Sequence, residues 1–426
     1  MTYFLDNYRG FKNQYITLKT VNFFVGENST GKTSLISALT ILSDFRFWLS
    51  GEITSEQIEY KSFEDLYSAN PTRDYFSLGL IDYDGDKSIH VLCFKDDDGF
   101  PIIFREIVYT FQGDMIVIER GTDAVNYLTI KVNTLKDKEK PLEEILSYID
   151  SKDFRKLKMQ SIKLGNLRGQ RIPFSAYRQV IDANDKEVHK KFEKIRNYSS
   201  FYSINLSYLA PIRAKPLPLY SGGKQAFSPE GSHAPFILKE IISAKKDESE
   251  ILKMLNEYGQ ESGLFDSISA TTYGDKKISP FELAIEKNKT KYKISSVGYG
   301  VSQILPIITE LLLNQSSQMI TIQQPEVHLH PKAQASFGAF LYKIALKFKK
   351  RKFVVETHSD YVIDRFRYQL KVETTKIDSQ ILFFKNNGKN NIVNAISINT
   401  DGKYNENEID EFRSFFINES FKVMEI

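Results

Sequence analysis

Apolar residues follow two different periods along this chain, and their order predicts its main elements. Val21–Val25 is a short apolar run that predicts a buried strand, and residues 34–42 carry apolar side chains at helical spacing. Near the other end, Met319–Ile322 and Lys352–Val355 are again short and largely apolar, with a helical pattern over Ala333–Lys347 between them. Strands that alternate with helices indicate an α/β fold with a parallel sheet.

The middle of the chain has a different pattern. From Tyr75 to Val132, short strand-like runs are separated by turn-forming Asp and Gly residues, which predicts an antiparallel meander. Residues 135–200 are lysine-rich and mostly helical in pattern, so we expect an inserted helical lobe there. Strand character returns at Leu206–Ala210, and a Pro- and Gly-rich loop (211–229) and a helical pattern (235–258) follow.

The composition is that of an ordered protein. With 426 residues, 41% apolar and 26% charged, the chain can form two or three globular units or one domain with a large insertion. Its net charge of +3, from 57 Lys and Arg against 54 Asp and Glu, does not predict a nucleic-acid partner. The single cysteine, Cys93, excludes an intrachain disulfide framework and is expected to be a small buried apolar residue.

Nothing in the sequence predicts contact with a membrane. No apolar run approaches the roughly 18–20 residues that a spanning helix needs. Met1–Asp6 contains no basic segment followed by an apolar one, so no signal peptide is expected. With the single cysteine, these features predict a cytoplasmic protein.

The strongest motif is Gly26–Thr33, the loop between the predicted strand Val21–Val25 and the helix that follows it. It fits G-x-x-x-x-G-K-[ST] in full, in the strand–loop–helix context of a phosphate-binding loop (P-loop). Small residues let consecutive backbone N–H groups point at a phosphate, and the helix N-terminus adds a favourable dipole. Lys32 would reach the β- and γ-phosphates of ATP, and the Thr33 hydroxyl would bind Mg²⁺. The expected nucleotide-binding residues of this loop are Gly26, Asn28, Ser29, Thr30, Gly31, Lys32, Thr33 and Ser34.

A P-loop works with an acidic residue at the end of a neighbouring strand, which holds the Mg²⁺ water shell. The best candidate strand is Met319–Ile322, so a large insertion must separate the two halves of the site. That distance excludes a compact RecA-type order. The residues that follow this strand are Gln323, Gln324, Pro325, Glu326, Val327, His328, Leu329, His330 and Pro331.

Several segments, in this order, resemble those of ABC-type ATPases of the RecF/SMC/OLD-nuclease group, especially the stand-alone ATPases of prokaryotic anti-phage defence systems. The resemblance covers about residues 1–45 and 200–426. It implies an α/β fold: an ABC-type ATPase head (a P-loop NTPase) with an antiparallel β subdomain and an inserted helical lobe. The segments that carry it are the P-loop, Tyr8–Lys12, Tyr208–Arg213, Val297–Gln303, Gln323–Pro331 and Val355–Asp360.

The resemblance also suggests a division into three parts. Residues 1–134 would form the N-terminal half of the head, with the P-loop and the meander. Residues 135–200 would form the helical lobe, and residues 201–426 the C-terminal half of the head.

Further roles are implied by the same resemblance. Val297–Gln303 matches the signature segment, in which Gly300, Ser302 and Gln303 would bind the γ-phosphate of a nucleotide on the opposite subunit. His358 matches the switch histidine that reaches the γ-phosphate or the attacking water, and Arg213 would touch nucleotide or brace the subunit contact. The candidate catalytic residues are Gln323, Gln324, Glu326 and His358, and the candidate Mg²⁺ ligands are Thr33 and Gln323.

One departure from the family concerns hydrolysis. The family usually has a carboxylate where Gln323 stands, and Glu or Gln where Gln324 stands. A glutamine cannot accept a proton as a general base and is a weaker partner for the Mg²⁺ shell. Either hydrolysis is intrinsically slow, or a Glu→Gln change was introduced to trap bound ATP; Glu326 remains as a carboxylate. Binding of ATP and Mg²⁺ is therefore predicted, whereas ATPase activity is left open.

A metal site is the alternative for the histidines. His328, His330 and His358 could bind a catalytic metal, since H-x-H after a strand can do so. His328 and His330 can equally be structural, with a ring bonded to backbone.

Two basic segments raise the question of nucleic acid. For the run Lys347–Lys352 we favour a solvated helix end over a DNA patch. The lysine-rich residues 135–197 are interpreted in the same way, as a solvated lobe. The best basic cluster there, should it bind nucleic acid, is Lys191, Lys194 and Arg196.

The predicted function is a nucleotide-gated switch. Two heads would sandwich two ATP molecules, so a homodimer or higher homo-oligomer is expected. By resemblance the chain would be the sensor or scaffold of an anti-phage defence system, acting with a separate effector, a nuclease or a toxin. The alternatives are a DNA-repair or chromosome-maintenance ATPase that binds DNA directly, and a scaffold that binds ATP without hydrolysing it.

Overall fold

The computed structural model describes residues 1–405 except 52, 54–59, 84–87, 122–123, 133–134, 136–139, 164–179, 181–203, 244–249, 314–316 and 374–375, and in addition Phe412. The chain forms two compact units that interleave along the sequence. Unit 1 contains residues 1–18, 28–204 and 384–393, and unit 2 contains residues 19–27, 205–383 and 394–426. Residues 28–204 are thus inserted between two segments of unit 2.

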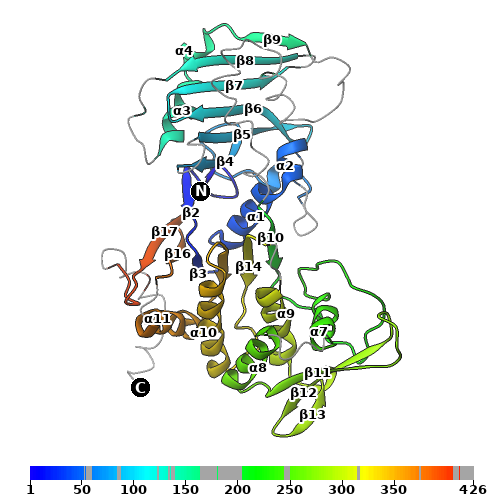
Figure 1. The fold of residues 1–426 in the computed structure, drawn as a ribbon. Helices are drawn as coiled ribbons and strands as arrows, with labels where there is room; N and C mark the ends of the chain where they lie inside the picture. Colours follow the sequence, from blue (N-terminus) through cyan, green and yellow to red (C-terminus); the bar gives the residue numbers. More distant parts are fainter. Residues whose placement is uncertain are drawn as a thin grey trace. The chain divides into compact units, whose positions relative to one another are not determined.

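Unit 1 is built on an eight-stranded antiparallel sheet with the strand order β2-β1-β4-β5-β6-β7-β8-β9 (Figure 1). This confirms the predicted meander and adds the N-terminal strands to it. The strands are β1 (Thr2–Asp6), β2 (Gln14–Thr17), β4 (Phe76–Asp82), β5 (Ser88–Asp97), β6 (Phe100–Thr110), β7 (Asp114–Arg120), β8 (Ala124–Lys131) and β9 (Gln160–Lys163). Its other elements are α1 (Lys32–Ser43), α2 (Phe45–Ser50), η1 (Phe63–Asp65), α3 (Pro141–Ile149) and α4 (Lys152–Arg155).

Alternate residues of these strands face one core, as the two-residue period of a strand requires. On β5 they are Ile89, Val91 and Cys93, and the apolar side of α3 packs in the same cluster. Cys93 is buried as expected, and burial raises the pKa of its thiol to about 11, so the thiol is unreactive.

The predicted helical lobe is only partly described. Helices α3 and α4 fit it, but residues 160–163 form β9, which pairs with β8 rather than continuing a helix. The basic cluster Lys191, Lys194 and Arg196 lies outside the described residues.

Most of the sheet that contains the parallel strands belongs to unit 2, whereas the end of β16 and the start of β17 belong to unit 1. The six-stranded sheet has the order β10-β14-β15-β3-β16-β17, and β10, β14, β15 and β3 pair in parallel. The predicted strands therefore lie side by side although they come from distant parts of the sequence. Their bounds are β3 (Val21–Gly26), β10 (Leu206–Leu209), β14 (Met319–Gln323), β15 (Lys352–Glu356), β16 (Ser379–Asn386) and β17 (Asn391–Ile398).

Within the described residues, five α-helices and a small sheet complete unit 2 (Figure 1). The antiparallel sheet β11-β12-β13 was not predicted, although Phe281, Leu283 and Ile285 show the alternation of a half-buried strand. These elements are α7 (Ala234–Ser243), α8 (Glu250–Ser262), α9 (Tyr299–Leu313), α10 (Pro331–Lys347), α11 (Asp360–Glu373), β11 (Ser267–Thr272), β12 (Phe281–Lys287), β13 (Thr290–Lys293) and the short η3 (Ile294–Ser296).

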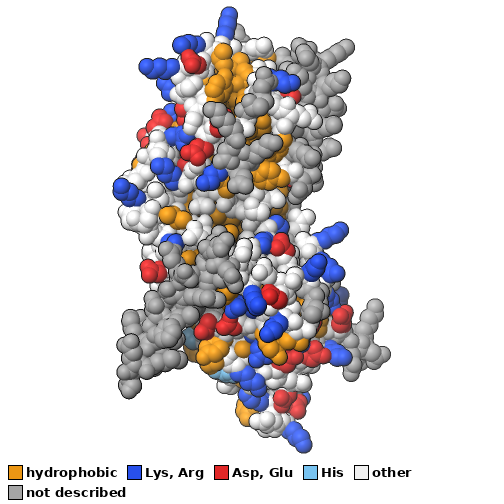
Figure 2. Space-filling view, turned by 90° about the vertical axis from the view of Figure 1, so that its left-hand side faces the viewer, with side chains coloured by type: hydrophobic (Ala, Val, Ile, Leu, Met, Phe, Trp, Pro, Cys, Tyr) orange, Lys and Arg blue, Asp and Glu red, His pale blue; other side chains and the backbone are white. Residues whose placement is uncertain are grey.

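The charged surface is mixed in sign. On the face that Figure 2 shows, Lys and Arg side chains are interspersed with Asp and Glu rather than gathered into one field. No helix in the described part of the chain is long and apolar enough to cross a membrane.

Close packing of α10 on α11 generates a stability prediction. A Cβ on Gly338 would lie 2.1 Å from the Val362 carbonyl oxygen, so Gly338→Ala forces the two helices apart. We expect it to lower the free energy of unfolding by about 1–3 kcal/mol, measured by urea denaturation. Gly223→Ala is the control, because its Cβ would meet only Ile278 at 3.9 Å. Equal stability of both variants would contradict this account of the packing.

Candidate functional site

The carboxyl ends of four parallel strands lie at one edge of the unit 2 sheet. Strand β3 ends at Gly26, β15 at Glu356, β14 at Gln323 and β10 at Leu209. Ligands of open α/β sheets bind outside this edge. The P-loop begins here, since Gly26 is its first residue; Gly26 and Glu27 belong to unit 2 and residues 28–33 to unit 1.

The P-loop has the backbone that its motif requires. Gly31 lies in the left-handed region at φ +99, immediately before α1. A Cβ there would lie 2.7 Å from the Phe11 ring and 2.8 Å from Asn391 Nδ2, so only glycine fits. Lys32 begins α1, and only 5% of it is exposed.

Within unit 1, two distant segments hold this loop. Asn391, on β17, donates from Nδ2 to the Arg9 carbonyl (3.0 Å), and its backbone N–H bonds the Gly10 carbonyl (2.8 Å). Arg9 in turn donates from Nε to the Ser34 hydroxyl (3.0 Å). Asn391 was not a candidate from the sequence, because no motif marks it.

Gln323 is held at both ends of its side-chain amide. Tyr208 donates its hydroxyl to Oε1, and Nε2 donates to Glu356 Oε2 at 2.5 Å. Both Gln323 and Glu356 are buried. Burial, followed by the charge of Glu356, raises the pKa of Tyr208 to about 12, so it stays a donor.

Arg213 is buried next to this pair. Its Nη2 donates to the Gln323 carbonyl at 2.6 Å, whereas Nε and Nη1 find no acceptor among the described residues. Burial lowers the pKa of the guanidinium to about 10, and the charge of Glu326 opposes that change. The group remains charged at neutral pH, with two N–H donors directed at no described group.

Glu326 organises the segment that contains His358. Its carboxylate accepts from the His358 backbone N–H at 2.7 Å and from the Thr357 hydroxyl at 2.8 Å. Burial raises the pKa of Glu326 while these two donors lower it. The segment before Glu326 is strained, since Gln324 has φ +46 without being glycine.

The structure brings together only part of the predicted set. Gln323, Gln324, Glu326 and His358 meet at the carboxyl edge through the hydrogen bonds above and that of the Gln324 N–H to the Glu356 carbonyl (2.8 Å). Gly300 packs near the next loop: a Cβ there would lie 2.9 Å from the His328 carbonyl. Their catalytic and nucleotide-binding roles remain predictions.

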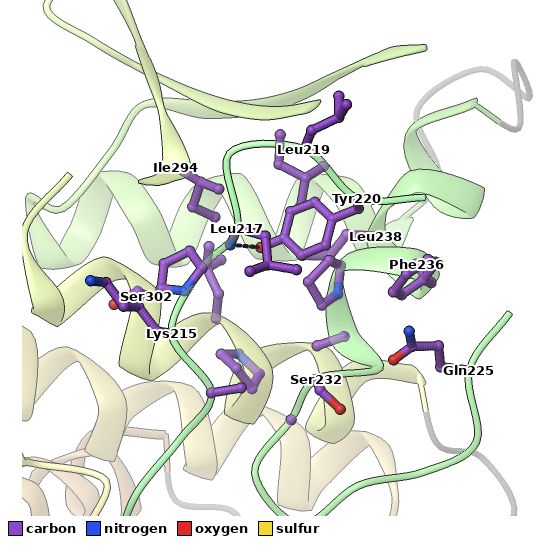
Figure 3. A pocket seen from close by; sticks show the side chains of 18 of the residues that line it. Lys215, Leu217, Leu219, Tyr220, Gln225, Ser232, Phe236, Leu238, Ile294 and Ser302 are labelled. Atoms are coloured by element: carbon purple, nitrogen blue, oxygen red, sulfur yellow. Dashed lines mark hydrogen bonds between the residues drawn. The ribbon is translucent and has the colours of Figure 1, made fainter. Parts of the chain in front are cut away.

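Ser302 and Gln303 are buried rather than displayed. The Ser302 hydroxyl donates to the Tyr299 carbonyl at 2.9 Å, and Ser302 lines a largely apolar cavity of about 330 Å³ (Figure 3). The cavity lies among the Pro- and Gly-rich loop and helices α7 and α9, and the Tyr220 hydroxyl fixes that loop by accepting from the Leu217 N–H (3.0 Å).

The alternative metal site does not form in the described part of the chain. No three His, Cys, Asp or Glu side chains there come together in a way that could hold a metal ion. His330 is structural, since its Nδ1 accepts from the Ala333 N–H and caps α10, and the His328 ring packs on Tyr299 at 5.4 Å.

The basic run Lys347–Lys352 has mixed roles. Arg351 is buried and donates to the Leu311 carbonyl at 3.2 Å, and Lys352 is the first residue of β15. Only Lys347, Lys349 and Lys350 are exposed, so the run is no continuous patch.

These residues fit a nucleotide with Mg²⁺. In unit 2, buried Arg213 has N–H donors without an acceptor among the described residues, and these suit an anion such as phosphate. In unit 1, Gly31 gives the loop the left-handed backbone that leads into the N-terminus of α1, where phosphate binds. The acids of the unit 2 edge are oxygen ligands, the kind that Mg²⁺ prefers, and so, taken by itself, is the Thr33 hydroxyl of unit 1. Mg²⁺ would neutralise phosphate charge, and the chain would orient it.

Comparison with known proteins places the chain among ATPases. The AAA ATPase domain family matches residues 4–363, a range that includes the P-loop, both glutamines and His358. No curated protein sequence gives a significant match.

Among solved structures, the chain is similar to Smc head domains. That of Pyrococcus furiosus, with an extended coiled coil and bound to the C-terminal domain of ScpA, is 11% identical with a TM-score of 0.41, covering 99% of this chain and 98% of that one. The head domain from Thermotoga maritima is 12% identical with a TM-score of 0.38, covering 92% and 97%. The head domain with a coiled coil and joint from Pyrococcus yayanosii is 10% identical with a TM-score of 0.38, covering 93% and 96%.

The contacts of Glu326 generate a prediction. Glu326→Ala removes the acceptor of two donors and should lower the free energy of unfolding by about 2–3 kcal/mol, measured by urea denaturation. Glu326→Gln keeps an acceptor oxygen and avoids burial of a charge, so it should cost clearly less. Equal losses in both variants would show that the carboxylate charge, rather than its acceptor geometry, stabilises this segment.

Proposed function

The chain belongs to the AAA ATPase domain family, and from this premise we propose that it works as an ABC-type, nucleotide-gated switch. Two heads bind Mg²⁺-ATP between them, and each γ-phosphate joins the P-loop of one subunit to the start of α9 of the other. Self-association is then linked to the γ-phosphate, because a ligand shifts an equilibrium only by binding one state better.

The observation that carries this proposal is the edge of the parallel sheet. There the P-loop strand lies beside β15, whose end holds Glu356 and leads to His358, and β15 lies beside β14, whose end holds Gln323. Strands from the two ends of the chain supply one surface for the triphosphate. A switch needs such an arrangement, because the group that distinguishes ATP from ADP must meet residues on several elements.

Slow hydrolysis belongs to the same proposal. Gln323 has both ends of its amide engaged, and an amide does not accept a proton as a general base. A long-lived ATP state favours a sensor or scaffold over a metabolic enzyme. We place it in an anti-phage defence system in the cytoplasm, with a separate nuclease or toxin as effector; this context rests on the ordered motif set alone.

The P-loop lysine tests nucleotide binding. Lys32→Ala should weaken ATP binding at least tenfold, the effect of losing a charge-assisted hydrogen bond of about 1.5–3 kcal/mol. Isothermal titration calorimetry measures it, and Lys350→Ala, at an exposed lysine, is the control. Unchanged affinity in Lys32→Ala would overturn the proposed site.

The start of α9 tests self-association separately. Gly298 has open space around it, so Gly298→Glu adds a negative charge where the partner's γ-phosphate is proposed to bind. We expect this variant to bind ATP like wild type but to sediment as a monomer, whereas wild type dimerises with ATP and not with ADP. Sedimentation velocity measures the difference. Dimerisation of Gly298→Glu with ATP would contradict the role of α9.

A further inference from the structure

Glu356 is a buried carboxylate that no motif marked as functional. It ends β15, the strand between β14 and the P-loop strand β3. Its neighbours in register are Gln323 on one side and Phe24 on the other, and Phe24 comes two residues before the P-loop glycine Gly26. Glu356 thus lies one strand nearer to the P-loop strand than Gln323, the position where an acid was expected.

Glu356 and Gln323 project from the same face of the sheet. Their chain neighbours Val355 and Ile322 belong to the unit 2 core cluster, and successive side chains of a strand point to opposite faces. The hydrogen bond between Gln323 Nε2 and Glu356 Oε2 (2.5 Å) confirms this placement. Only 4% of either residue is exposed.

Two hydrogen bonds hold the Gln323 side chain so that it positions Glu356. The Tyr208 hydroxyl occupies the amide oxygen of Gln323, which fixes the amide so that its N–H₂ group faces the carboxylate. A glutamine held in this way donates to a carboxylate and positions it. This gives Gln323 a role that an acid at the same position could not fill, because two adjacent carboxylates repel each other.

Arg213 is independent evidence that this edge takes a charged ligand. It is 4% exposed, and its Nε and Nη1 have no acceptor in the described part of the chain. A buried guanidinium with two unpaired N–H groups is costly unless an anion completes it. Phosphate oxygens are the acceptors that a guanidinium recognises best.

We propose that Glu356 supplies the carboxylate for the Mg²⁺ of the bound nucleotide, in place of the acid that β14 lacks at Gln323. The inference rests on the proposed function, since it requires a nucleotide on the P-loop. Mg²⁺ is usually bound by one or two carboxylates together with phosphates and water, so one displaced acid is sufficient. Gln323 is then a positioning residue, which holds Glu356 through its amide.

The experiment separates Mg²⁺ from nucleotide. A fluorescent ATP analogue is titrated into the full chain with Mg²⁺ and with EDTA, and the ratio of the two affinities is the Mg²⁺ increment. Glu356→Gln should lower this increment about ten- to a hundredfold by weakening the affinity in Mg²⁺. The affinity in EDTA should not fall, because loss of a negative charge does not weaken binding of a metal-free triphosphate. Glu286→Gln, a matched change on β12, should keep the wild-type increment.

An exchange variant tests whether Glu356 takes the place of an acid at position 323. Glu356→Gln with Gln323→Glu swaps acid and amide between two neighbouring strands and preserves one hydrogen bond between them, so folding should be retained even if the single variant is unstable. We expect it to regain the increment. Mn²⁺ in place of Mg²⁺ gives a second readout, since its electron paramagnetic resonance spectrum reports bound metal without any turnover.

The outcomes distinguish the two proposals. If wild type binds no ATP in either buffer, the proposed function fails, and this inference fails with it. If wild type shows an increment that Glu356→Gln retains, the inference alone is overturned. If the exchange variant folds, binds ATP and still lacks the increment, Glu356 does not stand in for an acid on β14, and the replacement is likewise overturned.

Discussion

The cost of burying charge at the carboxyl edge of the parallel sheet determines how this site is built. Glu and Arg side chains are mostly exposed in proteins, yet Glu356 and Arg213 are only 4% exposed here. Glu326 is partly buried. Each therefore needs hydrogen-bond partners from a segment other than its own. Gln323, itself held by the Tyr208 hydroxyl, donates to Glu356, and the Gln323 carbonyl accepts from Arg213. The His358 N–H and the Thr357 hydroxyl donate to Glu326.

This constraint also explains the order of the strands. An acid or a guanidinium at the end of one strand is satisfied by groups at the ends of its neighbours, so the partners must be adjacent in the sheet. Residues as distant as Phe24 and Glu356 become neighbours because β3 pairs with β15, and Tyr208 reaches Gln323 because β10 pairs with β14. The core side of β3, β14 and β15 is apolar, which fixes which face the polar residues of these strands take.

How much of this could be predicted depends on whether the signal is local. The P-loop, its strand and α1 were predictable because motif, period and turn occur within one short segment. The parallel strands β14 and β15 were predictable for the same reason. The small sheet β11–β13 was missed although β12 alternates, because its flanking strands are polar: all four residues of β13 are exposed.

The partners of the site residues were out of reach for a physical reason. Nothing near Asn391 shows that its side chain packs on Gly31, and nothing near Glu356 shows that Gln323 donates to it, because register between distant strands is set by the whole sheet. The glutamines show the consequence. On the sequence alone, Gln323 is a lost acid and predicts lost chemistry. Beside Glu356 it is a donor, so the property to be judged is the charge of the edge as a whole rather than the identity of one residue in a motif.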